Sequence, residues 1–516
     1  MPVFSRLVPW GPSPSWGTVT LTVVIAALGL LSANVVSTVT KYLLRRHLYH
    51  GLPRRHDTSI PSIRISFEER GVERTVEQLW DETTQGFAPI ADFGYTFGGN
   101  HGVVLTDPED FKVILTDEDK FVKDLRWKVV AQFLGDGLIT SEGALWRHRR
   151  KVLTPAFHFG FLKNLVPTMT DLTARFISRL EDLGPEKTLD PYEQFSQVTL
   201  AVIIESSLRS DLVPVQSAAS AFHDVTNAFA VYLAGSLLFG PLATYLPFVD
   251  RLIAKKFVLR RLLSSALAKR REQLRASAVE NGGSGGDGGQ REFKDFFSLL
   301  IASGELSDDE ILDEGISFFF AAHDTSSSGL SWILYFLCLH PEYQVRIQEE
   351  LAAKEFDLAT LTAEKLEEFT LLKQVFQETL RMRPPLPFLC RLTTEETIFK
   401  DHSIPAGTVL FMMVQATHHD PKYWDEPQRF NPERFSKDSE EAASRHPFAY
   451  LPFSAGPHSC IGKRFAMQEV RILLGAVLSR FNVKGETAGV TIDKRVLAKP
   501  RNFRVKFVPR QGESTK

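Results

Sequence analysis

The segment PFSAGPHSCIGKRF, residues 452–465, places a cysteine in a loop with glycines on both sides. Cys460 is one of three cysteines in 516 residues, and the other two, Cys338 and Cys390, lie far from it in the sequence. An odd and sparse set of cysteines does not form a disulfide framework, and it indicates a reducing compartment. The thiolate form of cysteine is a strong ligand for a soft or borderline metal. The rest of the chain therefore has to fold around a loop that presents one sulfur.

The number of ligands that this loop offers narrows the kind of metal site. Zinc requires about three or four protein ligands and an iron–sulfur cluster requires further thiolates, but no second cysteine lies near Cys460 in the sequence. A haem supplies four nitrogens itself and needs only one axial sulfur from the protein. Gly456 and Gly462 allow the backbone to approach the ring and to donate N–H groups to the sulfur, which stabilises the thiolate. The next segment, IGKRFAMQEVRILLGAVLSRF, predicts a helix whose N-terminal dipole also favours a negative sulfur.

Residues 17–39, GTVTLTVVIAALGLLSANVVSTV, contain no charged side chain. A helix of this length spans roughly 34 Å, which is enough for a bilayer core of about 30 Å. A cleaved signal peptide has a shorter apolar segment of about 7–15 residues and a small-residue cleavage site. Basic residues gather after the segment, at 41, 45, 46, 54 and 55, so the positive-inside rule places the body of the protein in the cytosol. We expect a lumenal N-terminus (1–16), a single transmembrane signal anchor (17–39) and a basic hinge (40–60).

The remaining residues, 61–516, predict one α+β domain that is mainly α-helical and has a smaller β-rich region. Short alternating runs such as HGVVLTD indicate strands before residue 115, whereas apolar residues at three- and four-residue intervals indicate helices from 108 to 380. The stretch NGGSGGDGG, residues 281–289, predicts a flexible loop between helices. A net charge of -2 gives no global attraction to nucleic acid.

The loop around Cys460 resembles the haem-binding signature of the cytochrome P-450 superfamily, F-x-x-G-x-[basic]-x-C-x-G. The matching residues are Phe453, Gly456, His458, Cys460 and Gly462, followed by Ala466 at the usual small position of the next helix. This resemblance, which spans residues 53–509, implies the P-450 fold and a heme b (iron protoporphyrin IX) whose iron has Cys460 as axial ligand. It also implies O2 as co-substrate. His458 stands where arginine is commonest, and it donates less strongly to a haem propionate when it is neutral.

The segment ETLR places Glu378 and Arg381 three residues apart, on one face of a predicted helix. On its own this spacing is also that of an ordinary surface ion pair. The resemblance implies instead that the pair joins Arg434, from the later PERF segment, in a buried charge triad that fixes the cysteine loop. Arg429, in EPQRF, is a second match, and the spacing to Cys460 favours Arg434.

The segment FFFAAHDTSSSG resembles the long central helix that crosses the haem in this family. Asp324 and Thr325 match its acid–alcohol pair and are the candidate catalytic residues, because a hydroxyl beside a carboxylate can hold the water that delivers protons to oxygen. The simpler interpretation is a threonine that bonds back to its own helix backbone. Three phenylalanines directly before the pair favour deep burial, where polar groups need partners.

The segment LWRHRRK matches the W-x-x-x-R helix of the family, in which Trp146 and Arg150 face the haem propionates. Arg391, after RPPLPFLC, matches another propionate-binding position. The other basic residues on these segments also fit a solvated face, but we favour a docking surface for an acidic electron donor: Arg147, Arg149, Lys151, Lys463 and Arg464.

The resemblance implies a membrane-anchored haem-thiolate monooxygenase that inserts one oxygen atom of O2 into a C–H bond of a lipophilic substrate. No flavin or nicotinamide phosphate-binding loop is evident in the sequence. The implied partners are therefore a membrane-bound NADPH–cytochrome P-450 reductase, with cytochrome b5 as a further donor, and the lipid bilayer. The implied location is the endoplasmic reticulum membrane, with one span and a cytosolic catalytic domain.

The segments WRHRRKVLTPAFHF and THHDP look most like the microsomal fatty-acid ω-hydroxylase group. That group commonly carries a glutamate that can esterify the haem, and Ala321 at the matching position excludes this link. An apolar pocket is expected from Phe319, Phe320, Phe388 and Leu389, and it is compatible with fatty acids, sterols or terpenoids, although aromatic clusters are more often core. We expect residues 229–248, which are uncharged, to form a membrane-touching substrate entrance.

Two other classes of protein stay open. A haem-thiolate isomerase or dehydratase that acts on peroxides needs no reductase, and it usually lacks the acid–alcohol pair. A membrane-anchored haem sensor or electron carrier has no use for Asp324 and Thr325 beside an apolar pocket. Turnover without NADPH and reductase would favour the isomerase or dehydratase.

Overall fold

The computed structural model describes residues 90–95, 101–208, 249–280, 295–493 and 497–510, apart from several positions between 125 and 133. The expected anchor (17–39), the hinge (40–60), the glycine-rich loop (281–289) and the segment 229–248 lie outside these residues. Within the described ranges we find no helix that has both the length and the apolar character needed to cross a bilayer.

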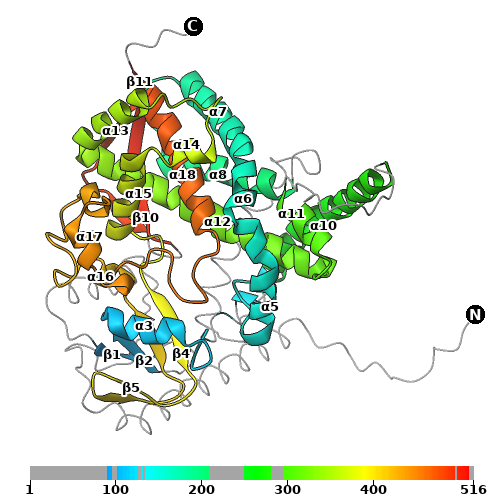
Figure 1. Ribbon diagram of the computed structural model, residues 1–516, viewed down its shortest axis with the longest axis vertical. Coiled ribbons are helices and arrows are strands. Elements are labelled where there is room, and N and C mark those ends of the chain that lie inside the picture. The colour runs from blue at the N-terminus through cyan, green and yellow to red at the C-terminus, as the bar shows by residue number, and fades with distance from the viewer. Residues whose placement is uncertain are drawn as a thin grey trace, which may run out of the picture.

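The described chain is mainly helical, as the sequence predicts, with a smaller sheet region at one end of the molecule (Figure 1). The α-helices are α3 (Pro108–Thr116), α5 (Gly143–Leu153), α6 (Phe159–Leu162), α7 (Val166–Leu183), α8 (Pro191–Leu208), α10 (Val249–Glu280), α11 (Phe296–Ser303), α12 (Asp308–Leu339), α13 (Pro341–Ala353), α14 (Ala363–Leu366), α15 (Thr370–Met382), α16 (Val414–Thr417), α17 (Glu440–Ser444) and α18 (Lys463–Arg480). Short 3-10 turns are η2 (Thr154–Phe157), η3 (Lys163–Leu165), η5 (Pro432–Phe435) and η6 (Pro447–Ala449).

The sheet region contains a five-stranded mixed sheet in the order β1-β2-β7-β4-β3. Its strands are β1 (Ile90–Tyr95), β2 (His101–Leu105), β7 (Val409–Met412), β4 (Leu389–Thr393) and β3 (Phe121–Val122). β2 runs parallel to β7, and the other neighbours are antiparallel. Two-stranded pairs complete the strands: β5 (Thr397–Phe399) with β6 (His402–Ile404), β9 (Thr491–Asp493) with β10 (Lys499–Arg501), and β8 (Phe481–Glu486) with β11 (Arg504–Pro509). Strands were expected in these regions, at HGVVLTD, at DHSIPAGTVLFMMV and at NFRVKFVP.

The central helix α12 crosses the helical part of the molecule and contacts α8, α15 and α18 (Figure 1). It begins at a capping box, in which the Ser307 hydroxyl accepts from the amide of Glu310 and the Glu310 carboxylate accepts from the amide of Ser307. Most of its later residues are buried. A helix that is buried on nearly all sides has to be apolar around its circumference, so the polar residues within it need partners inside the protein.

Helix α18 begins directly after the cysteine loop, with Gly462 as its N-cap residue. It packs against α7, α12, α13 and α15, and residues 468–478 are buried along its length. The loop that carries Cys460 is thus attached to a helix that the core holds firmly. The predicted helix after Cys460 is confirmed.

Candidate active site

The cysteine loop is closed by its own backbone. The Cys460 amide donates to the Phe453 carbonyl at 2.9 Å, and the Ser459 amide donates to the Gly456 carbonyl at 3.0 Å. Gly456 has φ +70, and a Cβ atom there would lie 1.9 Å from the carbonyl oxygen of Leu115. Only glycine accommodates both this backbone conformation and this close approach. The loop is therefore pressed against the end of α3 at Gly456.

Cys460 presents its sulfur at the N-terminus of α18, where the amides of Gly462 and Lys463 donate to it. The cysteine is solvent-exposed as a residue, yet protein surrounds the sulfur closely enough that desolvation raises the pKa of the thiol. The two amides and the charge of Arg150 act in the opposite direction and favour the thiolate. These donors are the ones that stabilise a sulfur bound to a metal.

Basic side chains gather beside the loop. Trp146 and His458 stack with ring centroids 3.7 Å apart, and Arg150 Nη1 donates to the Ser459 carbonyl at 2.9 Å. Burial, together with Lys123, Arg391 and Arg150, lowers the pKa of His458 to about 3, so the imidazole is neutral. Burial lowers the pKa of Lys123 to about 8, and the nearby Arg391 contributes to this shift.

Such a cluster of mutually repelling basic groups suits an anion that lies between them. A haem carries two carboxylates, and the guanidinium groups of Arg150 and Arg391 are the candidates to bind them, whereas the Lys123 ammonium already donates to three backbone carbonyls and adds positive charge beside them. Together with the sulfur and its two amide donors, this donor set fits a haem. Lys123 did not emerge from the sequence, because it lies in no motif and its ammonium is placed by the carbonyls of Leu138, Ile139 and Ser141, which are remote along the chain.

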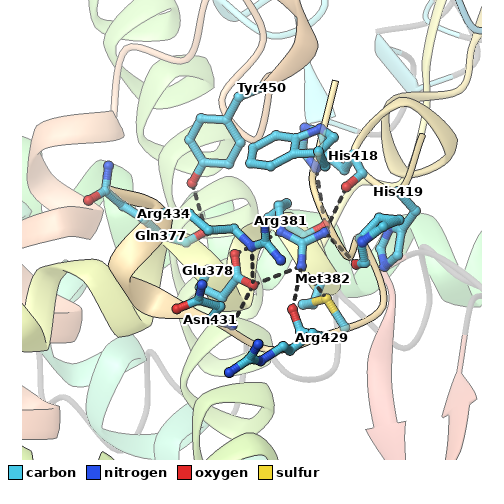
Figure 2. Close-up of polar contacts among 12 residues, drawn as sticks. Gln377, Glu378, Arg381, Met382, His418, His419, Arg429, Asn431, Arg434 and Tyr450 are labelled. Atoms are coloured by element: carbon cyan, nitrogen blue, oxygen red, sulfur yellow. Dashed lines mark hydrogen bonds and ion pairs between the residues drawn. The ribbon is translucent and has the colours of Figure 1, made fainter. Parts of the chain in front are cut away.

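Glu378, Arg381 and Arg434 meet in a buried cluster between α15 and η5 (Figure 2). Arg381 binds Glu378 through two hydrogen bonds, from Nε at 2.7 Å and from Nη2 at 2.8 Å. Arg434 Nε lies 3.5 Å from the Glu378 carboxylate. The same carboxylate also accepts a hydrogen bond from the backbone N–H of Asn431 at 2.9 Å. Arg429 instead points to Glu426 in an exposed pair at 2.8 Å. The geometry thus brings together the three residues assigned to the triad.

His418 links this cluster to the cysteine loop. Arg381 donates to the His418 carbonyl, and Nε2 of His418 accepts from the amide of Leu451 at 2.9 Å. Leu451 stands directly before the loop segment 452–465. The segment THHDP indicates only a family likeness in the sequence, and the role of its first histidine, His418, follows from these contacts.

On α12, the two candidate catalytic residues make separate contacts. The Thr325 hydroxyl donates to its own helix, to the carbonyls of Ala321 at 2.8 Å and Ala322 at 3.2 Å. The Asp324 carboxylate accepts from the hydroxyl of Tyr192 on α8. The helix back-bonding of a threonine is therefore present, and the acid is held by a residue that the sequence did not point to.

A further carboxyl group lies deep in the same region. Glu469 on α18 is 1% exposed, and neither of its oxygens has a hydrogen-bond partner within 3.5 Å among the described residues. Burial raises its pKa to about 8, and the nearby Ser326 hydroxyl, next to Thr325 in sequence, partly offsets this. Glu469 is therefore protonated at neutral pH.

The candidate pocket residues are dispersed. Phe319 is 1% exposed and belongs to the main apolar core, whereas Phe320 and Ala321 are partly exposed on α12. Phe388, directly before β4, and Leu389, the first residue of β4, pack against two different apolar clusters. Phe319 therefore belongs to the core, and Phe320, Ala321, Phe388 and Leu389 stay candidates for the pocket.

The basic face expected for an electron donor is smaller than the sequence suggested. Arg149 is 2% exposed and binds Glu314 of α12 at 2.9 Å, so its assignment to that face is wrong. The charge run hides a core ion pair because position 149 turns toward α12. Arg147, Lys151, Lys463 and Arg464 are exposed.

The chain is similar to known proteins in sequence and in fold. Residues 73–507 match the family model described as Cytochrome P450. Human "Cytochrome P450 4V2" is 31% identical over 78% of this chain and 78% of that protein, and human "Cytochrome P450 4A11" is 31% identical over 82% of each. "Cytochrome P450 4c3" of Drosophila melanogaster is 30% identical over 79% of this chain and 80% of its own length. Among solved structures, "Crystal structure of cytochrome P450DA heme domain" matches with a TM-score of 0.72 and 21% identity, over 85% of this chain and 94% of that chain.

Proposed function

This chain belongs to the cytochrome P450 family, and we propose that it is a membrane-anchored monooxygenase that hydroxylates fatty acids or similar lipophilic molecules. Members of the family are oxidoreductases that use a haem with a cysteine thiolate ligand and O2 as co-substrate, so the chain is a haem-thiolate monooxygenase. The observation that carries the assignment is the placement of the Cys460 sulfur, which has two amide donors at the start of α18 and a basic cluster beside it.

The residues around Cys460 have different proposed roles. We propose that Cys460 would hold the haem iron through its sulfur and that Arg150 and Arg391 would hold the propionates, with the positive charge of Lys123 beside them. Trp146 holds the ring of His458 by stacking, so the loop residue next to Ser459 keeps its place. When bound, the haem supplies the activation of O2, which a thiolate ligand promotes by donating electron density. Phe453, Gly456, Gly462 and Ala466 are proposed to shape the haem surface.

Asp324 and Thr325 are proposed to handle protons on α12. The Asp324 carboxylate takes up a proton from water and releases it again, and the Thr325 hydroxyl holds the water that receives it. Phe320 and Ala321, which precede them, present apolar surface that limits the water near the reacting C–H bond. The buried triad of Glu378, Arg381 and Arg434 holds the cysteine loop in position through His418.

The substrate class is supported by the sequence likeness to the fatty-acid ω-hydroxylase group and by relatives named as cytochromes P450 4. Ala321 excludes a covalent ester between the chain and the haem at that position. Phe320, Phe388 and Leu389 would offer apolar surface to a lipophilic substrate. Phe319 supports the pocket from the core.

Anchoring in the endoplasmic reticulum membrane is supported by the uncharged segment 17–39 and the basic residues after it. The same orientation gives access to a membrane-bound NADPH–cytochrome P450 reductase, and to cytochrome b5, through the exposed residues Lys151, Lys463 and Arg464. We propose residues 229–248 as a lipid-side entrance for the substrate.

A reduced, carbon monoxide-bound absorption spectrum tests the haem ligand directly. We expect a thiolate-type spectrum in the wild-type protein and its loss in Cys460→Ala. Incubation with reductase, NADPH and a series of fatty acids should then yield hydroxylated products. Protein without haem, or a spectrum unchanged in Cys460→Ala, would contradict the assignment, and turnover of lipid peroxides without reductase would favour an isomerase or dehydratase.

A further inference from the structure

Two groups of hydrogen bonds join α8 to the same part of α12, residues 323–327. Nearer the start of α8, the hydroxyl of Tyr192 donates to Oδ1 of Asp324. Two turns later, the Thr199 hydroxyl lies 3.2 Å from the His323 carbonyl and 2.9 Å from the Ser327 hydroxyl. The first of these contacts involves a proposed proton carrier, and the second involves only helix packing.

The ring of Tyr192 is held by a third element. The ammonium of Lys499, on β10, lies 3.9 Å from the centre of the ring, within the range of a cation–π contact. Its neighbour Ala498 is fixed to α12, because its carbonyl accepts from Ser328 Oγ and Trp332 Nε1, both at 2.8 Å. The position of the Tyr192 hydroxyl is therefore set by α8, α12 and β10 together.

The contacts of the Asp324 carboxylate are uneven. Both of its polar contacts among the described residues are to Oδ1, from Tyr192 and from His323 Nε2 at 3.3 Å, and Oδ2 has no hydrogen-bond partner there. His323 Nδ1 lies 3.0 Å from the Phe319 carbonyl, which only accepts, so Nδ1 carries the proton. Nε2 of His323 can donate to Oδ1 only when the imidazole carries both protons, whereas the Tyr192 hydroxyl donates to Oδ1 in either state of His323.

The hydroxyl is well suited to keep its proton. Burial raises the pKa of Tyr192, and the Asp324 carboxylate raises it further. The Asp324 side chain is 15% exposed, so water reaches part of it. Thr325, the next residue, directs its hydroxyl to carbonyls of its own helix and does not hold the carboxylate.

We propose that Tyr192 is a positioning residue for Asp324: by fixing Oδ1, it makes Oδ2 the oxygen that exchanges protons with water. A proton from bulk water binds the Oδ2 carboxylate oxygen to give the acid, and the acid becomes a carboxylate again when that proton passes to a pocket water. The inference rests on the proposed monooxygenase function. Without Tyr192, the carboxylate rotates freely and delivers the proton less often.

The decisive comparison is Tyr192→Phe against Thr199→Val, in the full-length protein with reductase, NADPH and a fatty acid that the wild-type protein hydroxylates. Tyr192→Phe keeps the ring and its contact with Lys499 but removes the donor to Asp324. We expect the fraction of NADPH that yields product to fall about 3- to 10-fold, with hydrogen peroxide formed instead, and the solvent deuterium isotope effect on product formation to increase. Thr199→Val removes contacts between the same two helices and should leave both quantities near the wild-type values.

A double-mutant cycle supplies a readout that needs no turnover. Denaturant unfolding of Tyr192→Phe, Asp324→Ala and the double variant should show a smaller combined loss of stability than the sum of the single losses, because each single change removes the same hydrogen bond. Additive losses of stability would overturn the proposal. It would also be overturned if Tyr192→Phe converted the wild-type fraction of NADPH into product, or if Thr199→Val lowered that fraction as much as Tyr192→Phe does. If the wild-type protein forms no product with any lipid, the proposed function fails, and the cycle still decides whether Tyr192 holds Asp324.

Discussion

Arg381 and His418 hold each other through reciprocal hydrogen bonds between side chain and backbone. Nη1 of Arg381 donates to the His418 carbonyl at 2.8 Å, and Nδ1 of His418 lies 3.2 Å from the Arg381 carbonyl, to which it donates (Figure 2). The other ring nitrogen accepts from the Leu451 amide. This arrangement requires a neutral imidazole with its proton on Nδ1, and it transmits the position of the buried triad to the chain that enters the cysteine loop.

Replacement of His418 by Leu removes both hydrogen bonds of the imidazole ring and puts an apolar side chain in its place. We expect a loss of about 2–4 kcal/mol in the free energy of unfolding at pH 7, because the buried Leu451 amide loses its acceptor. Haem content measured by absorbance should fall as well. Wild-type haem content in this variant would show that the loop does not depend on His418.

The difference in unfolding free energy between the wild type and His418→Leu should depend on pH. Burial, with the charge of Arg381, lowers the pKa of His418 from 6.5 to about 3 in the folded protein. Between these values the unfolded chain binds more protons, so His418 lowers stability as the pH falls from about 6.5 toward 3. The difference between the wild type and His418→Leu should therefore narrow in that window, as measured by urea unfolding at several pH values.

The arginines of EPQRF and PERF form a matched pair of variants. Arg434 is 3% exposed and contacts Glu378, whereas the Arg429 side chain is 64% exposed and pairs with Glu426. Arg434→Ala should cost about 3–5 kcal/mol, since it leaves buried charges without their partner. Arg429→Ala should change stability little. Equal effects in chemical denaturation would contradict the assignment of Arg434 to the triad.

Much of the fold followed from periodicity and motif order, because helices such as α7, α15 and α18 have apolar residues at regular spacing. The residues that hold the motif side chains in place did not follow. Tyr192 donates to Asp324 on α12, and Lys123 belongs to the basic cluster beside Cys460. Both residues come from segments far away in the sequence, and local sequence patterns carry no information on such contacts. Arg149 is the opposite case. It lies in a run of basic residues that predicts an exposed face, but its side chain is buried in the core, where it binds Glu314.

Two glycines with similar backbone angles separate crowding from conformational strain. Gly456 has φ +70 and faces the Leu115 carbonyl, whereas Gly489 has φ +74 and no atom within 4 Å of an added Cβ. Gly489→Ala should cost about 1–2 kcal/mol from the backbone conformation alone. Gly456→Ala should lower stability by more and reduce haem content, because the loop has to move away from α3. Similar stability losses for the two variants in thermal unfolding would argue against the crowding at Gly456.

The buried carboxyl of Glu469 predicts a stability that falls as the pH rises. Its pKa is about 8 in the folded protein and near 4.5 in the unfolded chain, so between these values the folded protein binds the extra proton. The contribution of Glu469 to folding stability should therefore decrease by about 1.4 kcal/mol for each pH unit in this window. Glu469→Gln should flatten the curve, and the exposed Glu349→Gln on α13 is the control. A curve unchanged by Glu469→Gln would mean that the group is ionised in the folded state.

Arg149 and Lys151, two residues apart on α5, distinguish a core ion pair from a docking surface. Arg149→Ala removes the partner of the buried Glu314, and we expect it to cost about 3–5 kcal/mol in urea unfolding. Lys151 is exposed, and Lys151→Ala should leave stability unchanged while it raises the KM for the reductase about 2- to 5-fold at low ionic strength, because steering by exposed charges weakens with salt. At high salt the two reductase KM values should converge. A KM for reductase that is insensitive to Lys151→Ala at every salt concentration would place the electron donor elsewhere on the surface.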